Sequence, residues 1–349
     1  MIAEDVLMAV DASSPPDPAP ILHLVEAFRH SKTMFAAVGL GVFDALEEGP
    51  KPLDALAPAL GVDADALGRL LDACVHLGLL TRSESGYADS PASAAYLTSK
   101  SPRRLTGYVN YSNAILWKLW GNLEGAIREG TNRWKETYGW DGPIFDHMFA
   151  TETSKREFLM GMHGFGMISS PEVVAAFDLS RFRTLADLGG ATGHLAVAAC
   201  ERYPQLQGVV FDLPAVMPLA REIVGGSLVS DRIRLEPGDF FNDPLPQADL
   251  YALGRIVHDW TEAKCLKLLA RIHDALPSGG GLLIAEKMLD EDKTGPRWAL
   301  MQSLNMLTCT EGKERSLTEY RALLGQVGFR DVIGCRTMSP LDAILAVKS

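Results

Sequence analysis

From Phe182 to the C-terminus, short apolar runs alternate with stretches of helical period. A short apolar run bounded by a turn is typical of a buried strand, whereas apolar residues at three- and four-residue steps are typical of a helix. Strands are predicted in TLADLGG, QGVVFDLP, IRLEPGDFF, ADLYALGRIV and GGGLLIAEKML. Helices are predicted in LAVAACERYP, CLKLLARIHDAL and YRALLGQVGF, before a final strand region. This alternation predicts an α/β fold with a parallel, doubly wound sheet.

The N-terminal part of the chain has a helical pattern instead. Apolar residues recur at helical spacing from Ile21 onward. After Gly49-Pro50 the pattern predicts a helix, a turn at Gly61, a second helix from about Asp63 and a small hairpin around Ser83–Gly86. This order is typical of a winged helix, which can bind DNA through its second helix. Here that helix carries two aspartates against one arginine, so a packing or dimerisation role is favoured.

Composition narrows the class of partner. The chain has 349 residues with 33 basic and 44 acidic side chains, a net charge of −11, so nucleic acid and anionic membranes are not expected partners. No apolar run approaches the roughly 18 residues of a membrane span. The N-terminal segment is acidic and proline-rich, unlike a signal peptide, and we expect a cytoplasmic protein.

The cysteines and histidines do not predict a metal site. The five cysteines are widely spaced and form no CxxC pair, so a disulfide framework or a cysteine-rich zinc site is not expected. No pair of histidines has the spacing of metal ligands.

The sharpest local signal is a glycine turn, Asp187-Leu188-Gly189-Gly190-Ala191-Thr192-Gly193, between a predicted strand and a helix. Glycine permits a tight turn and lets a ligand approach the backbone closely. Asp212 ends the next strand, 25 residues after Asp187, where an acidic side chain can accept both ribose hydroxyls of a nucleotide. The turn matches neither GxGxxG nor GxxxxGK[ST], so a nucleoside without phosphate is favoured, namely S-adenosylmethionine (SAM).

A second candidate is His258, which follows the fourth predicted strand. Ligands of such sheets lie beyond the carboxyl ends of the strands. A histidine there can take the proton of a hydroxyl acceptor, because its pKa lies near the operating pH. Considered alone, a single histidine is more often structural.

These segments together resemble the caffeate/acetylserotonin family of small-molecule O-methyltransferases. The motifs occur in the family's order: DLGGATG, GVVFDLPAV, EPGDFFNDPLPQADLY, RIVHDWTEAKCLKLL and EGKER. The resemblance implies a Rossmann-like class I methyltransferase domain with an N-terminal, mainly helical, winged-helix dimerisation domain. It also implies a homodimer that uses SAM, releases S-adenosylhomocysteine and methylates a small-molecule acceptor without a metal.

On this basis we expect four segments. They are a flexible tail (1–20), a winged-helix-like dimerisation domain (21–110), a helical connector that lines the acceptor pocket (111–170) and a SAM-binding catalytic domain (171–349).

The resemblance also assigns site residues. Those expected to bind SAM are Asp187, Gly189, Asp212, Leu213, Asp239, Phe240 and Arg255. Those expected in catalysis are His258 as base, with Glu286 and Glu314 near it. Those expected to bind the acceptor are Tyr111, Tyr138, His163, Arg255, Asp259 and Asn305. Ala191 departs from the family, which often has a third glycine there, and we expect a small effect on SAM affinity if its φ is negative.

Alternatives to O-methylation stay open at this point. Relatives of the family methylate the thioether 4-methylthio-2-hydroxybutyrate during dimethylsulfoniopropionate synthesis, and such an S-methyltransferase needs no base. Its anionic acceptor would instead need cationic or hydroxyl groups in the pocket. A ligand-binding protein that keeps the fold without transfer is a third possibility, disfavoured by the presence of both the glycine turn and His258.

Overall fold

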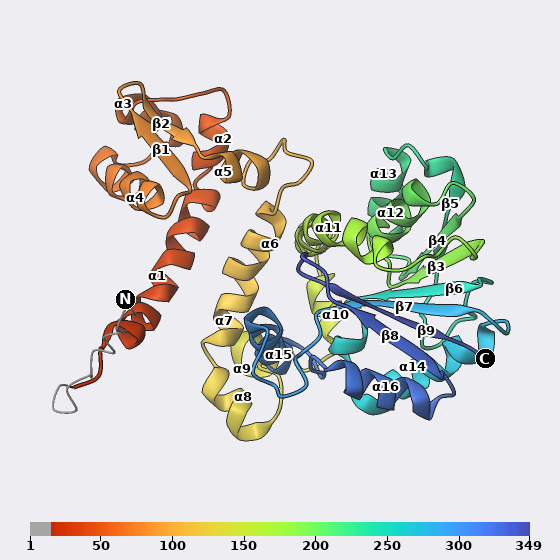
Figure 1. The fold of residues 1–349 in the computed structure, drawn as a ribbon. Coiled ribbons are helices and arrows are strands. Elements are labelled where there is room, and N and C mark those ends of the chain that lie inside the picture. The colour runs from red at the N-terminus through yellow and green to blue at the C-terminus, as the bar shows by residue number, and fades with distance from the viewer. Residues whose placement is uncertain (1–14) are drawn as a thin grey trace, which may run out of the picture. The chain divides into compact units, whose positions relative to one another are not determined.

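The computed structural model describes residues 15–349, which divide into two compact units at Ser93/Ala94 (Figure 1). Most of the predicted tail, residues 1–14, lies outside the described residues. The first helix begins at Ala19, two residues before the predicted start. The limits predicted for the four segments remain predictions. No helix among residues 15–349 has the length and apolarity needed to cross a bilayer.

The N-terminal unit has the predicted order of helices and hairpin. Its elements are α1 (Ala19–Gly39), α2 (Val42–Leu46), α3 (Leu53–Leu60), α4 (Ala64–His76), β1 (Leu80–Ser83) and β2 (Gly86–Asp89), and α5 (Pro91–Tyr96) crosses the boundary. Gly61 ends α3 in the left-handed conformation, with φ of 66°. Asp63 then caps α4, because its carboxylate accepts the Ala66 N–H at 2.8 Å. These local signals explain why the winged-helix pattern was predictable.

The second unit begins with a helical region. Its elements are α6 (Thr106–Tyr111), a π-helical turn (Ser112–Leu116), α7 (Trp117–Trp120), α8 (Leu123–Glu129), α9 (Trp134–Tyr138), α10 (Ile144–Met148) and α11 (Glu152–Ala175). The long helix α11 starts at a capping box formed by Thr151 and Ser154. Gly161 lies against the backbone of Gly107, where an added Cβ would be 3.3 Å from the Gly107 carbonyl carbon. The glycine at position 161 therefore allows α11 to pack closely against α6.

A seven-stranded sheet follows, in the order β5-β4-β3-β6-β7-β9-β8. The strands are β3 (Thr184–Leu188), β4 (Gln207–Asp212), β5 (Ile233–Pro237), β6 (Leu250–Gly254), β7 (Gly281–Glu286), β8 (Asp331–Cys335) and β9 (Asp342–Val347). The helices are α12 (His194–Arg202), α13 (Met217–Gly225), α14 (Glu262–Ala275), α15 (Arg297–Cys309) and α16 (Leu317–Gln326), with short 3₁₀ turns at Ser230–Arg232 and Val257–Asp259.

The predicted parallel sheet is confirmed for β3 to β7, and β9 is the exception. It runs antiparallel to both of its neighbours, β7 and β8. The connection between β8 and β9 covers only residues 336–341, whereas a parallel neighbour requires a crossover of a dozen residues or more.

Apolar side chains cover both faces of the sheet. One cluster joins the strands to α11 and α12, and the other joins them to α14 and α16. Figure 1 shows α12 and α13 on one side of the sheet and α14 and α16 on the other. The chain adds β4 and β5 on one side of β3 and then returns to place β6 on the other side. This reversal of strand order leaves a crevice at the carboxyl ends of the strands, where ligands of such sheets bind.

Candidate active site

A cavity of about 370 Å³ lies at the carboxyl ends of these strands, within the second unit. Most of the residues predicted from the sequence contribute to its wall. They are Tyr111, Asp187, Gly189, Asp212, Leu213, Asp239, Phe240, Arg255, His258, Asp259 and Asn305. The fold therefore brings together residues that are up to 194 positions apart in the chain.

Two predicted acceptor residues, Tyr138 and His163, are not among the residues that line the cavity. The Tyr138 hydroxyl donates to the carbonyl oxygens of Ala114 and Ile115 at 2.9 and 3.3 Å, beside the π-helical turn. The His163 Nδ1 is 2.9 Å from the Thr192 hydroxyl, behind the glycine turn. The Tyr138 hydroxyl and the His163 Nδ1 thus have partners inside the protein.

The glycine turn presents bare backbone to the cavity. Gly189 has a φ of 70°, a left-handed conformation that favours glycine. A Cβ at this position would be 2.6 Å from Ile256 Cδ1 and 3.3 Å from Phe240 Cε1. A side chain would therefore collide with the cavity wall.

Ala191 also adopts a left-handed conformation, with φ of 49°, so the condition attached to the expected small effect, a negative φ, is not met. This conformation costs an L-residue roughly 1–2 kcal/mol. Asp212 holds it in place, because its Oδ2 accepts the Ala191 N–H at 2.8 Å while Oδ1 accepts the Leu213 N–H at 2.7 Å. Burial raises the pKa of Asp212 to about 6, although these two hydrogen bonds lower it. Each carboxylate oxygen keeps a lone pair for a ligand hydroxyl.

Three buried polar atoms in the cavity wall have no hydrogen-bond partner among the described residues. They are Asp187 Oδ2, Arg255 Nη1 and Trp260 Nε1, and the first two belong to ionisable groups. Burial, with a further contribution from the Asp212 carboxylate, raises the pKa of Asp187 to about 7. The Arg255 guanidinium lies 4.6 Å from the centre of the Phe165 ring. An unpartnered acceptor and an unpartnered cationic donor fit a ligand with an ammonium and a carboxylate, such as the amino-acid part of SAM.

Asp239 and Phe240 follow β5 in the same wall. The Asp239 carboxylate accepts the Phe241 N–H at 2.8 Å and an amide proton of Asn242 at 2.6 Å. Asp239 thus closes a turn, as expected of such a residue, and this turn presents the Phe240 ring to the cavity.

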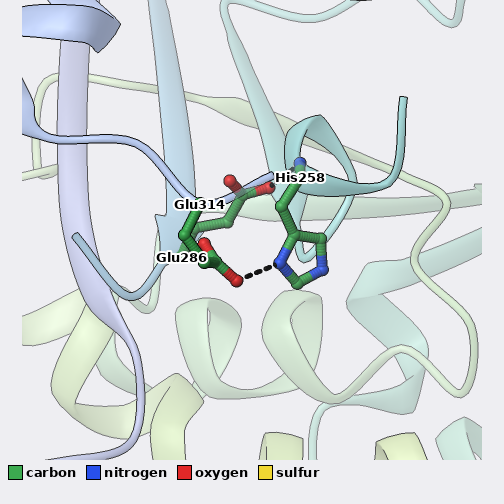
Figure 2. Close-up of side chains that lie close together, drawn as sticks. All are labelled: His258, Glu286 and Glu314. Carbon is green, nitrogen blue, oxygen red and sulfur yellow. Dashed lines mark hydrogen bonds and ion pairs between the residues drawn. The ribbon is translucent and has the colours of Figure 1, made fainter. Parts of the chain in front are cut away.

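His258 in the wall forms a buried cluster with two glutamates that do not line the cavity, Glu286 and Glu314 (Figure 2). The His258 Nδ1 is 2.6 Å from Glu314 Oε1, so the imidazole donates Nδ1–H to this carboxylate. Glu286 instead accepts the backbone N–H of His258 at 3.0 Å and the hydroxyl of Tyr320. Glu314 therefore orients the ring, Glu286 holds the backbone, and Nε2 is left to act on a ligand.

The charge of His258 depends on these neighbours. Burial favours the neutral imidazole, but the carboxylates of Glu314, Glu286 and Asp259 outweigh it and raise the pKa of His258 to about 9. Burial likewise raises the pKa of Asp259 to about 6. Ligand atoms of His258, Glu286 and Glu314 lie within 4.8 Å of one another, a spacing that could hold a metal ion. Hydrogen bonds within the protein engage both oxygens of Glu286 and the Oε1 of Glu314, whereas Glu314 Oε2 is buried without a partner among the described residues.

The opposite wall is largely aromatic and includes residues that the sequence did not identify individually. Asn305 on α15 has its Oδ1 bound by the Trp120 indole N–H at 2.8 Å, which leaves the amide NH₂ for a ligand. Unpredicted aromatic residues of the wall are Tyr108, Phe145, Phe149, Phe158 and Trp260. The sequence predicts that residues 111–170 line the acceptor pocket, but no spacing rule separates lining rings from packed ones.

Comparison with known proteins identifies two matching family models. An O-methyltransferase domain matches residues 120–330, and an O-methyltransferase dimerisation domain matches residues 22–99. The chain is 42% identical to acetylserotonin O-methyltransferase of Bos taurus over 328 residues, covering 92% of this chain and 95% of that protein.

A second relative is longer than this chain. The chain is 42% identical to the probable bifunctional dTTP/UTP pyrophosphatase/methyltransferase protein of Homo sapiens, covering 96% of this chain and 54% of that protein. Among solved structures, human N-acetylserotonin methyltransferase in complex with SAM is similar, with a TM-score of 0.91 and 38% identity. This match covers 97% of this chain and 100% of the other.

The left-handed conformation of Ala191 leads to a stability prediction. Ala191→Gly should raise the free energy of unfolding by about 1 kcal/mol, because glycine adopts a positive φ without strain. Ala198→Gly, inside α12, is the matched control and should lower it by about 0.5–1 kcal/mol. Urea denaturation measures both variants, and a loss of stability in Ala191→Gly equal to that of the control would contradict the prediction.

Proposed function

This chain belongs to the family of SAM-dependent small-molecule O-methyltransferases, and we propose that it methylates the hydroxyl group of a small aromatic acceptor with His258 as the base. The family resemblance drawn from the sequence is confirmed by the matches to family models and relatives. The observation that carries the proposal is the His258–Glu314 hydrogen bond of 2.6 Å behind an aromatic-lined cavity.

We call the part of the cavity beside the glycine turn the donor end, because its residues can bind SAM, the methyl donor. When bound, SAM supplies a methyl group activated by a positively charged sulfur. Asp212 is positioned to accept the ribose hydroxyls, and Phe240 to lie against the adenine ring. Asp187 and Arg255 supply the unpartnered acceptor and donor for the ammonium and carboxylate. Gly189 and Leu213 also line this part of the cavity, and Gly189 can contribute only backbone.

The chemistry assigned to the protein itself is proton removal and alignment. The neutral His258 Nε2 takes the hydroxyl proton of the acceptor, which makes the oxygen a better nucleophile. Glu314 holds Nδ1–H and stabilises the imidazolium that forms. Glu286 and Tyr320 fix the backbone of the segment that carries His258. The aromatic side chains of the cavity wall would pack against the acceptor and orient its oxygen for transfer.

The proposed acceptor is a hydroxyindole of the N-acetylserotonin type. Relatives with 42% identity carry the name acetylserotonin O-methyltransferase. Tyr108 and Tyr111 offer aromatic faces to a planar ring, and the free amide NH₂ of Asn305 can donate to an acetyl carbonyl. Asp259, 3.7 Å from His258 Nε2, lies beside the position of the reacting hydroxyl.

The alternative of S-methylation is not favoured. A thioether has no proton to transfer, so it gives no role to the buried His258–Glu314 pair. A thioether acceptor of this kind also needs a cationic group to bind its carboxylate. Arg255 lines the cavity and could do so, but it is already proposed to bind the carboxylate of SAM.

We further propose a homodimer formed through the N-terminal unit. The matched dimerisation domain supports it. The first turns of α1 also expose large apolar side chains at helical spacing, namely Ile21, Leu22, Leu24, Val25 and Phe28, each more than half exposed. Exposed apolar surface of this kind is typical of an interaction face.

The acceptor assignment has a direct test. The full chain is incubated with SAM and, separately, with N-acetylserotonin or 4-methylthio-2-hydroxybutyrate, and release of S-adenosylhomocysteine is measured. We expect turnover on the hydroxyindole alone. Turnover on the thioether alone would overturn O-methylation, whereas turnover on neither would reject both acceptors.

The base assignment predicts a pH dependence. Only neutral His258 accepts a proton, so kcat/KM should rise with pH up to about 9, the raised pKa of this imidazole. His258→Ala should lower kcat about 10²-fold or more and abolish this part of the profile, while binding of S-adenosylhomocysteine stays unchanged. Glu314→Gln should shift the rise to lower pH, because it removes the carboxylate charge. If kcat/KM of His258→Ala still rises with pH in the same range, the rise belongs to ionisation of the acceptor and the base assignment is wrong.

The dimer proposal is tested by light scattering after gel filtration. Replacing both Leu24 and Phe28 with Glu should convert the dimer into a monomer, since charges would be buried in the interface. Leu228→Glu, at a position that is 95% exposed in the second unit, is the control and should leave the dimer intact. A wild-type monomer at micromolar concentration would disprove the proposal.

A further inference from the structure

His194 lies in the cavity wall but has no role in the function proposed above. It is the first residue of α12 and directly follows the glycine turn. Its neighbours in the wall include Gly189, Gly190 and Ala191 of that turn, together with Arg255. The side chain is therefore at the donor end of the cavity, among the residues proposed to hold the amino-acid part of SAM.

The structure provides a specific space for this imidazole. A Cβ at Gly166 on α11 would lie 2.3 Å from His194 Cγ and 2.4 Å from its Cδ2 and Nδ1. Real Cβ atoms do not approach this closely, so the ring occupies the space that a side chain at position 166 would fill. Gly166 is itself part of the cavity wall. The His194 ring can therefore occupy this space only because residue 166 is a glycine.

A hydrogen bond fixes the ring in this space. The hydroxyl of Ser170, one turn after Gly166 on α11, lies 2.9 Å from His194 Nδ1. This contact engages Nδ1 and leaves Nε2 as the ring nitrogen for a ligand. Positioning of this kind, with a locked ring and a supporting hydrogen bond, is typical of side chains that bind a ligand.

The environment also sets the charge of the ring. Burial, with smaller contributions from His163 and Arg255, lowers the pKa of His194 to about 3. The imidazole is therefore neutral across the working pH range. A neutral hydrogen-bonding group suits this position, because a further positive charge would repel both the nearby Arg255 guanidinium and a sulfonium ligand.

We propose that the imidazole of His194 hydrogen-bonds the amino-acid end of SAM, in cooperation with Arg255. The proposal rests on the proposed function, since it requires that SAM occupies this cavity. It adds the Gly166–His194–Ser170 unit to the donor site, with Gly166 providing the space, His194 the contact and Ser170 the orientation.

The test measures binding of S-adenosylhomocysteine, which has the same amino-acid end, by titration calorimetry on the full chain. His194→Ala should raise Kd about tenfold, and Ser170→Ala about threefold, as expected for loss of a hydrogen bond and of its support. Gly166→Ala should also raise Kd by displacing the ring. Adding Gly166→Ala to His194→Ala should cause no further loss, because the three atoms nearest to the added Cβ all belong to the imidazole.

His273→Ala is the matched control. This histidine also packs against a glycine, since a Cβ at Gly328 would lie 2.9 Å from its Nε2, but it does not line the cavity. The control should lower the thermal unfolding midpoint with Kd unchanged.

Two results would overturn the role of His194. One is a Kd for His194→Ala within twofold of wild type, and the other is an additive effect of Gly166→Ala and His194→Ala. If His194→Ala does not fold, the Kd of Ser170→Ala decides, and a wild-type value rejects the proposal. Failure of the wild-type chain itself to bind S-adenosylhomocysteine would contradict the proposed function and, with it, this inference.

Discussion

The reversal of strand order between β3 and β6 is the constraint on which the site depends. Because β4 and β5 lie on one side of β3 and β6 and β7 on the other, the loops after these strands diverge and leave space at their carboxyl ends. The loop after β3 contains the glycine turn, and the loop after β6 contains Arg255 and His258. Asp212 is the last residue of β4 and lies at the same edge of the sheet. The aromatic wall from α6, α10 and α11 then closes this space.

Burial in this closed space controls the electrostatics of the site. It opposes charge on each titratable group, so that the pKa values of Asp187, Asp212 and Asp259 rise while that of His194 falls. His258 differs because three carboxylates surround it and outweigh burial. The cavity wall thus has one imidazole, His194, whose pKa is lowered mainly by burial, and another, His258, whose pKa is raised by neighbouring carboxylates.

Backbone strain occurs in the same wall. Three non-glycine residues among those described have a positive φ, namely Ala191 (49°), Arg255 (59°) and Lys293 (60°), and the first two line the cavity. This conformation is costly for residues other than glycine, so the surrounding structure has to compensate for it. The Asp212 carboxylate does so for Ala191, and the hydrogen bond from Arg255 N–H to the Ala285 carbonyl, 3.1 Å long, does so for Arg255.

Much of the fold and the site chemistry was determined by the sequence alone, because the signals are local. Strand and helix periodicity, the turn at Gly61 and the glycine turn before α12 each depend on a few adjacent residues. The motifs around Asp212 and His258 likewise occupy contiguous segments, so their place at strand ends was predictable. Only the tertiary structure decided that Glu314 rather than Glu286 contacts the imidazole, and that Tyr138 and His163 lie outside the cavity wall. It also decided the left-handed φ of Ala191 and the space for His194, since each depends on atoms brought together from distant segments, which no local pattern of residues encodes.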